Sequence, residues 1–270
     1  MTAFGVHFAF EFKTGLRNRN QLFINYIFPL GVFFLLAFMM PQLNPAFKET
    51  LLPAMVIFAV LSSNILGLPT PIIEAREAGV YRSYKINGVP AASILSIPVI
   101  TNIFHSLIVA AIITVTGILL FDGLAPTNWP IYVFLTVLFA FTCASLGALI
   151  GVIATSSTQS VLFSQLIFLP SMLIGGLMIP LSMLPAAIQP FSALLPTTHG
   201  MIAYTGLAYG VGTAINPWLS TVLLLISGLL AFGLAIYLFN WDNRNQARRG
   251  SPLLALLAMA PYLVGVFLIW

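Results

Sequence analysis

Long apolar stretches separated by short polar turns dominate this chain of 270 residues. A helix needs about 20 apolar residues to cross the hydrocarbon core of a bilayer. Stretches of that kind predict membrane-spanning helices at 21–40, 51–72, 93–121, 130–154, 161–180 and 218–240, with a further apolar stretch at 252–270. The stretches are continuously apolar and lack the alternation of transmembrane β-strands. The pattern therefore predicts an all-α, multi-pass membrane protein, with a single domain over residues 1–270.

Composition supports this fold class. Hydrophobic residues make up 60% of the chain and charged residues only 6%, and the mean hydropathy is +1.04, whereas soluble domains carry about 25% charged residues. The only cysteine, Cys143, excludes an intrachain disulfide and a cysteine-based metal site. With Gly147 and Gly151 it forms a stripe of small residues in the fourth span. Such a stripe lets helices pack closely, either within the bundle, which we favour, or at a dimer interface.

The positive charges predict the topology. Nine of the ten Lys and Arg residues fall in three clusters, which lie before the first span, between the second and third spans, and after the sixth span. Because the chain changes sides with each span, all three clusters fall on the same side of the membrane. They are Lys13, Arg17 and Arg19; Arg76, Arg82 and Lys85; and Arg244, Arg248 and Arg249. Lys48 alone falls on the other side. The positive-inside rule then places the N-terminus in the cytoplasm. Because topology accounts for the net charge of +4, the charge gives no reason to expect a nucleic-acid partner.

The first 20 residues predict a helix along the membrane surface. Phe8, Phe12 and Leu16 recur on one helical face, with Glu11 and Lys13 interleaved, which is typical of an interfacial helix. The alternative is a frayed basic tail. The following apolar run resembles a signal peptide, but no small-residue cleavage site follows it, so we expect it to be retained as the first span.

A polar segment at 74–90 interrupts the apolar pattern after the second span. Its first twelve positions hold five of the sixteen charged residues. The segment predicts an amphipathic helix, bent or divided at Gly79 and ended by Asn87-Gly88 and then Pro90. Glu74 and Glu77, at i and i+3, could bind a divalent ion, but Arg76 between them favours a structural role. We therefore predict no metal site.

A second unusual region follows the fifth span. Its helix-breaking residues are Pro170, Gly175, Gly176, Pro180, Pro185 and Pro196. They predict a broken span five and, at 186–195, a half-helix that enters the membrane from outside and returns, as irregular backbone can where protein or water satisfies it. The alternative is an apolar loop on the outer surface.

Signatures of catalysis are missing from the sequence. There is no G-x-S-x-G, no H-E-x-x-H and no P-loop, since Lys13-Thr14 is preceded by Phe12 rather than glycine. Residues 123–241 contain no Asp, Glu, Lys or Arg, and the proton relays of ion-coupled carriers need such residues inside the membrane. Asn102 and His105, one turn apart, could line a polar path; a histidine hydrogen-bonded within the bundle is the favoured alternative.

Three of these features together resemble the type-2 ABC transporter permease family. They are Glu74-x-x-Glu77-x-Gly79 with Pro90 opening the next span, the broken region from Phe168-Leu-Pro170 to Pro196, and an amphipathic N-terminal helix before a six-span core. The resemblance covers about residues 5–245. It implies the six-span exporter permease fold with a cytoplasmic coupling helix and re-entrant helices before span six. The apolar stretch at 252–270 departs from it, and is expected either to add a seventh span or to lie on the membrane.

The resemblance also implies a function. The chain would be the permease subunit of a multidrug- or antibiotic-type exporter in a prokaryotic plasma membrane, paired with a second permease copy or a paralogue and surrounded by lipid. It would not be an enzyme and would carry no cofactor, because ATP and Mg²⁺ would bind a separate cytoplasmic ATPase. The residues expected at the ATPase contact are Glu74, Arg76, Glu77, Gly79, Tyr81, Arg82, Tyr84 and Lys85.

The near absence of charge within the spans favours a lipophilic or amphipathic substrate, such as a drug, an antibiotic or a lipid-linked molecule. Export of a cell-envelope polysaccharide or glycolipid by the same mechanism is an alternative. A stand-alone secondary carrier or channel is an alternative from another class, and so is a membrane-embedded transferase with paired carboxylates.

Overall fold

The computed structural model describes residues 3–43, 47–241 and 250–269, and these ranges contain helices and no strand. The elements before the fourth span are α1 (Ala3–Arg17), α2 (Arg19–Leu22), η1 (Phe23–Ile27), α3 (Phe28–Leu43), α4 (Phe47–Leu61), η2 (Ser62–Leu66), α5 (Pro69–Glu77), α6 (Val80–Ile86) and α7 (Ala91–Phe121). The remaining elements are α8 (Trp129–Ile153), α9 (Ser157–Ile174), η3 (Leu181–Met183), α10 (Gln189–Ser192), α11 (Pro196–Ala203), η4 (Tyr204–Ala208), α12 (Pro217–Leu238), η5 (Pro252–Met259) and α13 (Ala260–Ile269).

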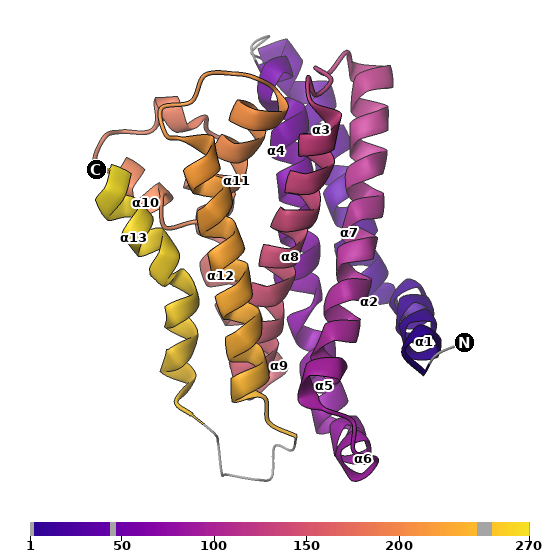
Figure 1. Ribbon diagram of the computed structural model, residues 1–270. Helices are drawn as coiled ribbons and strands as arrows, with labels where there is room; N and C mark the ends of the chain where they lie inside the picture. The colour runs from indigo at the N-terminus through magenta and orange to yellow at the C-terminus, as the bar shows by residue number, and fades with distance from the viewer. Residues whose placement is uncertain (1–2, 44–46, 242–249, 270) are drawn as a thin grey trace.

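Within these ranges, six helices are long and apolar enough to cross a membrane: Arg19–Met40, Thr50–Glu77, Ala91–Phe121, Trp129–Ile153, Ser157–Ile174 and Pro217–Leu238. They form one bundle (Figure 1). The predicted all-α, multi-pass class is therefore confirmed. Because apolar length fixes where such helices begin and end, most boundaries agree with the sequence to within a few residues.

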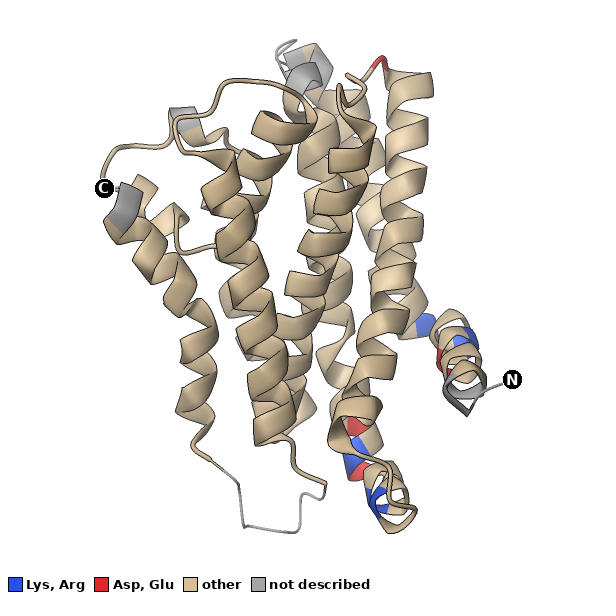
Figure 2. Cartoon of the chain, in the orientation of Figure 1, with Lys and Arg blue, Asp and Glu red and all other residues tan. Residues whose placement is uncertain are grey.

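Charged residues gather at one end of the bundle, which we call the charged end. In Figure 2 they colour parts of α1, the end of α5 and α6, while Asp122 lies at the opposite, far end after α7. Two of the three predicted cation clusters thus lie at one end. The third cluster falls within 242–249, which lies outside the described residues. The side chain of Lys48, the one cation predicted on the other side, is also not described.

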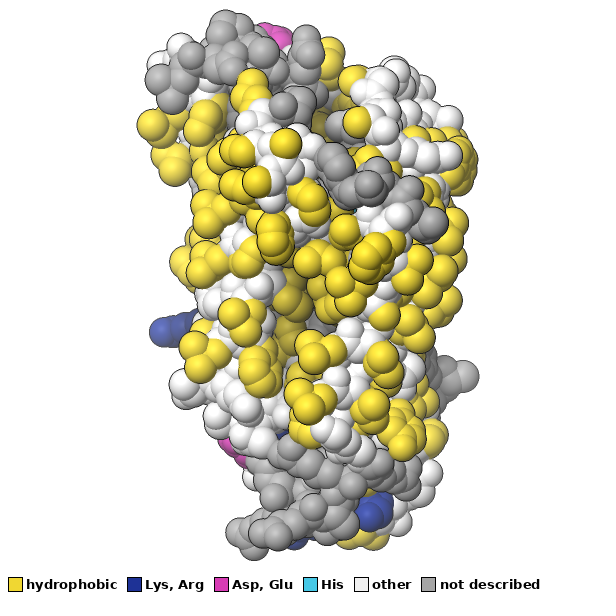
Figure 3. All heavy atoms as spheres, turned by 90° about the vertical axis from the view of Figure 1, so that its left-hand side faces the viewer, with side chains coloured by type: hydrophobic (Ala, Val, Ile, Leu, Met, Phe, Trp, Pro, Cys, Tyr) yellow, Lys and Arg dark blue, Asp and Glu magenta, His cyan; other side chains and the backbone are white. Residues whose placement is uncertain are grey.

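The bundle exposes an apolar surface between its two ends. Hydrophobic side chains cover most of the middle of the face in Figure 3. Leu119 is 74% exposed and Leu166 71%. A water-soluble protein of this size rarely leaves so much apolar surface open, whereas lipid tails solvate it.

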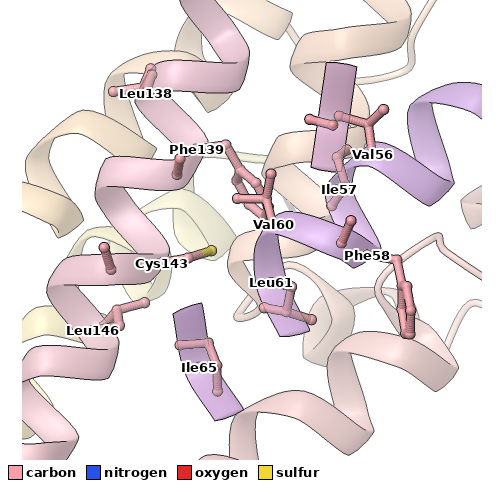
Figure 4. Packing of buried hydrophobic residues seen from close by; sticks show 14 of the residues in the cluster. Val56, Ile57, Phe58, Val60, Leu61, Ile65, Leu138, Phe139, Cys143 and Leu146 are labelled. Atoms are coloured by element: carbon pink, nitrogen blue, oxygen red, sulfur yellow. The ribbon is translucent and has the colours of Figure 1, made fainter. Parts of the chain in front are cut away.

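The core forms where α8 packs against the second span. Figure 4 shows Val60, Leu61 and Ile65 facing Phe139 and Cys143 across this contact. The small-residue stripe of α8 makes the approach close, because a Cβ on Gly147 would meet the Asn64 carbonyl oxygen at 2.3 Å and one on Gly151 would meet the Pro69 carbonyl oxygen at 3.0 Å. The stripe therefore serves packing within the chain, as the sequence favoured.

The fifth span ends earlier than predicted. Helix α9 stops at Ile174 rather than at 180. Gly175 abuts α11, since a Cβ there would lie 2.1 Å from Thr197 Oγ1, and Gly176 has a φ of +87° that favours glycine. Pro170 lies inside α9 and does not break it, which corrects the prediction for that residue. A proline inside a membrane helix is tolerated when neighbouring groups satisfy the freed carbonyl.

The helix predicted at 186–195 begins later in the chain. Residues 186–195 hold only the single turn α10, whereas α11 and η4 together form a helix over 196–208 that is mostly buried. Pro196 is a first-turn residue of α11, where a proline loses no hydrogen bond and its fixed φ suits a helix. Figure 1 shows the chain descending from the far end to α10 and returning through α11.

The C-terminal segment runs back alongside α12 (Figure 1), and the Ser227 hydroxyl of α12 donates a 2.8 Å hydrogen bond to the Ala258 carbonyl oxygen. Its apolar helix Pro252–Phe267 is shorter than the six spans. However, η5 is a 3₁₀ helix of 8 residues and α13 has 10. At about 2.0 and 1.5 Å per residue these reach about 31 Å, the thickness of a bilayer core.

The N-terminal helix predicted from the phenylalanine spacing is present as α1. It lies across the bundle axis and is seen nearly end-on in Figure 1. Phe8 packs edge-on against Phe104, at 5.5 Å between ring centroids, and Phe12 stacks on His105 at 4.4 Å. Part of the apolar face of α1 is therefore covered by α7, while Leu16 stays 41% exposed.

Candidate functional site

The polar segment after the second span forms two short helices at the charged end. Helix α5 continues the second span to Glu77, and α6 begins at Val80. Gly79 joins them with a φ of +75°, a left-handed conformation that glycine adopts without steric cost. Gly88, with a φ of +73°, follows the end of α6. The divided helix and its stop are as the sequence predicts.

Arg76 holds this segment to α8. It is only 5% exposed, and its guanidinium donates a 2.9 Å hydrogen bond to the Val152 carbonyl oxygen and a second, short one to that of Ala154. Both acceptors belong to the C-terminal end of α8, where the helix dipole favours a cation. In this conformation Arg76 fixes the segment internally and does not present its side chain to a partner.

The tyrosines of α6 also face inward. Tyr81 is 4% exposed and packs against Phe239, at 5.2 Å between ring centroids. Burial, followed by the Glu11 carboxylate of α1, raises the pKa of Tyr81 and that of the half-buried Tyr84. Helix α6 is thus packed against the chain that follows α12 and lies within the electrostatic reach of α1.

The remaining side chains form an outward surface, which we call the α5–α6 surface. It consists of Glu74, Glu77, Val80, Arg82, Lys85 and Ile86, all exposed. Ile86, at 81% exposure, is its most prominent apolar group. Sequence reasoning missed Ile86, although an apolar residue directly before the Asn87-Gly88 stop was a usable signal. Two acidic, two basic and two apolar side chains make this surface suited to a protein partner.

Asn102, one of the two residues that could line a polar path, connects three spans through hydrogen bonds. Asn25 Nδ2 donates to Asn102 Oδ1 at 2.9 Å, and Asn102 Nδ2 donates to Asn64 Oδ1 at 2.9 Å and to the Ser63 carbonyl oxygen at 3.0 Å. Asn25 and Asn64 lie in the π-helical turns η1 and η2. Such interhelical hydrogen bonds hold membrane helices in register.

The histidine predicted beside it has separate partners. His105 Nδ1 lies 2.7 Å from the Tyr26 hydroxyl, and its ring stacks on Phe12. It is 2% exposed. Both residues join α7 to η1, because His105 contacts Tyr26 and Asn102 contacts Asn25, the residue before Tyr26. This agrees with the favoured alternative of a histidine bonded within the bundle.

The helix-breaking residues are divided between two environments. Gly175 and Gly176 are buried against the α11 side of the bundle, while Pro180 and Pro185 lie on the segment that leads to α10. His199 of α11 stacks on Tyr262 of α13 at 5.1 Å between ring centroids. The broken region and the C-terminal segment therefore share a contact that the sequence did not predict.

Comparison with known proteins identifies the family. The model of the ABC-2 family transporter protein matches residues 44–237. This interval covers the second to the sixth membrane-spanning helices and includes the whole α5–α6 surface. The chain belongs to the ABC-2 transporter family.

A relative of this ABC-2 protein is found in Bacillus subtilis (strain 168), under the name "Putative transport permease YvfS". It is 23% identical over 226 residues, which cover 82% of this chain and 90% of the relative. ABC-2 membership makes the chain a membrane subunit of an ABC transporter, not itself an enzyme, with ATP hydrolysis on a separate ATP-binding cassette subunit. Helix α1 and the C-terminal segment lie outside the interval matched to the ABC-2 family.

Proposed function

We propose that this ABC-2 permease is the membrane subunit of an exporter that moves a lipophilic or amphipathic substrate outward, and that its ATPase docks on the α5–α6 surface. The observation that supports this most strongly is that exposed charged groups sit at the end of the most deeply buried of the six spans. The second span is 94% buried over its most apolar window. A displacement of α5 therefore acts directly on the core.

The contacts of the segment support a mechanical role. A partner that pushes on α6 would move α5, because only Ala78 and Gly79 separate the two helices. Arg76 would pass the same motion to α8 through its bonds to Val152 and Ala154. Closure of the ATPases on ATP would thus rearrange two central spans together, and the change would open the far end.

The charge distribution supports the substrate class. Residues 123–241, which include three of the spans, contain no ionisable Asp, Glu, Lys or Arg, so a charged substrate would find no opposite charge there. A drug, an antibiotic or a lipid-linked molecule fits this interior, and so does a cell-envelope glycolipid or polysaccharide. A secondary carrier is disfavoured because its coupling ion needs an intramembrane ionisable group.

A row of leucines supports pairing with a second permease copy. Leu162, Leu166, Leu169 and Leu173 of α9 are 61%, 71%, 50% and 56% exposed. Their spacing of four, three and four residues is that of a heptad seam. The α9 span is also the least buried of the six, at 22%. A second copy docked along this row would complete a dimer.

Purification tests the proposal. We expect the full chain, expressed with the ABC ATPase encoded beside its gene, to purify as a complex of two permeases and two ATPases whose ATP hydrolysis is vanadate-sensitive. A matched control is the same ATPase expressed without the chain, which should stay soluble. A chain that purifies alone, or transport that continues without ATP, would overturn the proposal.

We also propose that the charged end is cytoplasmic and that the C-terminal segment crosses the membrane. Single cysteines at Ser83, Leu124 and Phe267 test this, because native Cys143 is buried and should not react. In intact cells an impermeant maleimide should label the cysteines at 124 and 267 but not at 83, which should react only after permeabilisation. Labelling of position 267 only after permeabilisation would place the C-terminal segment on the cytoplasmic side instead.

A further inference from the structure

A cavity of about 470 Å³ lies toward the far end, between the start of α4, the broken end of α9 and the α10–α11 region. Its apolar lining includes Leu177, Leu181, Met201, Ile202, Val211 and Ile215. Its volume lies within the range of roughly 300–1,000 Å³ that is typical of small-molecule sites. It is large enough for a head group and part of a chain, but not for a polymer.

Hydroxyl groups make up most of the polar lining of this cavity. Of the five on described residues, including that of Thr50, four already donate their single proton to backbone carbonyl oxygens. The bonds are Ser192 Oγ to Gln189 (2.8 Å), Thr198 Oγ1 to Ser192 (2.6 Å), Thr205 Oγ1 to Met201 (2.7 Å) and Thr213 Oγ1 to Ile215 (2.8 Å). A hydroxyl that has donated can still accept through its lone pairs. The lining thus offers mainly acceptors.

Gln189 adds one more acceptor. Its side-chain Nε2 donates one of its two protons to the Leu184 carbonyl oxygen at 3.0 Å, which leaves the amide oxygen able to accept and the second N–H able to donate. Among the residues that the structure describes, none that lines the cavity is ionisable. A charged ligand would lose its hydration without gaining an opposite charge, whereas an uncharged ligand that supplies O–H or N–H donors would satisfy the acceptors.

We infer that this cavity binds an uncharged amphiphile whose head carries several hydroxyl groups, such as a monoglycosyl or glycerol head on an alkyl chain. The head donates to the oxygens of Ser192, Thr198 and Thr205, and the chain lies against the apolar lining. This inference rests on the proposed function in one respect, that the bound amphiphile is the exported substrate. It selects the glycolipid-like alternative over a cationic drug.

Photolabelling of the full chain in nanodiscs, without ATPase, tests the inference. The probe is octyl β-glucoside with a diazirine in its octyl chain, and the competitors are unmodified octyl β-glucoside, octyl sulfate, octyl trimethylammonium and methyl β-glucoside. We expect saturable labelling within 176–215 that only octyl β-glucoside displaces efficiently. Equal displacement by the ionic amphiphiles or by methyl β-glucoside would overturn the assignment of ligand class.

Two variants locate the binding. Gly212 lines the mouth of the cavity, because it is exposed and a Cβ on it would meet nothing within 4 Å. The ring of Gly212→Phe therefore has room to obstruct the cavity and should lower labelling on the order of tenfold. Gly233→Phe is the matched control, because Gly233 has the same open space on α12, and should leave labelling unchanged. Thr205→Val keeps the shape but removes one acceptor and should weaken binding about threefold to tenfold.

Unchanged labelling in both Gly212→Phe and Thr205→Val would overturn the site. Because the assay needs neither ATP nor a partner, such a failure is distinct from failure of the proposed export function. Conversely, the chain could bind the probe and yet assemble with no ATPase. That result would support the binding site and would overturn only its role in export.

Discussion

Replacing Arg76 with methionine is expected to destabilise the protein by about 2–4 kcal/mol and to abolish coupled transport, because two charge-assisted hydrogen bonds are lost. Methionine has a similar length but no donor, so the carbonyl oxygens of Val152 and Ala154 lose the guanidinium that bonds them. The end of α5 would then be free to move without α8. Thermal unfolding of the purified chain and ATP-driven transport in proteoliposomes measure the two effects.

Two controls separate this structural role from direct contact with the ATPase. Arg82→Met removes an exposed cation from the same segment and should change stability by no more than about 0.5 kcal/mol. Arg76→Lys should have an intermediate effect, since an ammonium group cannot reproduce the planar fork of guanidinium. If Arg76→Met left the unfolding temperature unchanged but prevented ATPase binding, Arg76 would be a contact residue after all.

Ile86→Asp is expected to prevent assembly with the ATPase while leaving the permease folded. Ile86 is 81% exposed, so its replacement removes little buried area within the chain. Burying an isoleucine side chain in a partner contributes about 1.5–3 kcal/mol, so its loss should weaken binding by about tenfold to a hundredfold. The buried carboxylate would add to this loss. Co-purification and the apparent affinity for the ATPase give the result.

The matched control for Ile86→Asp is Leu124→Asp. Leu124 is 49% exposed but lies in the loop after α7 at the far end. Its substitution should leave ATPase binding unaltered. Equal binding by the Ile86→Asp variant and the native chain would show that the ATPase contacts another part of the charged end, such as α1.

Much of the fold was predictable because apolar length and the spacing of turn residues are local properties. The six spans, the division at Gly79 and the helix stop at Gly88 all follow from short stretches of sequence. The end of span five was predicted too late. A helical wheel or a hydropathy plot does not show that α11 packs directly on Gly175. That contact ends α9 at Ile174, before Pro180 is reached.

The candidate site was only partly predictable, for the same reason. A helical wheel places Arg76 and Tyr81 on the polar segment but does not show which neighbours they meet. Their burial depends on the end of α8 and on Phe239, which are far away in the sequence. The exposed Glu74, Glu77 and Arg82 were easier to assign, because exposure is the usual state of a charged residue.

The sequence by itself determined that this is a multi-pass helical membrane protein with a compact charged segment after its second span, since burial of apolar surface in lipid depends on composition and length. Only the tertiary structure decided which charged residue is buried and where a cavity forms. Arg76 turns inward because the last carbonyl oxygens of α8 lie there to accept its protons. The acceptor-rich cavity exists because segments from 50 to 215 converge on it, and convergence of distant segments is a property of packing.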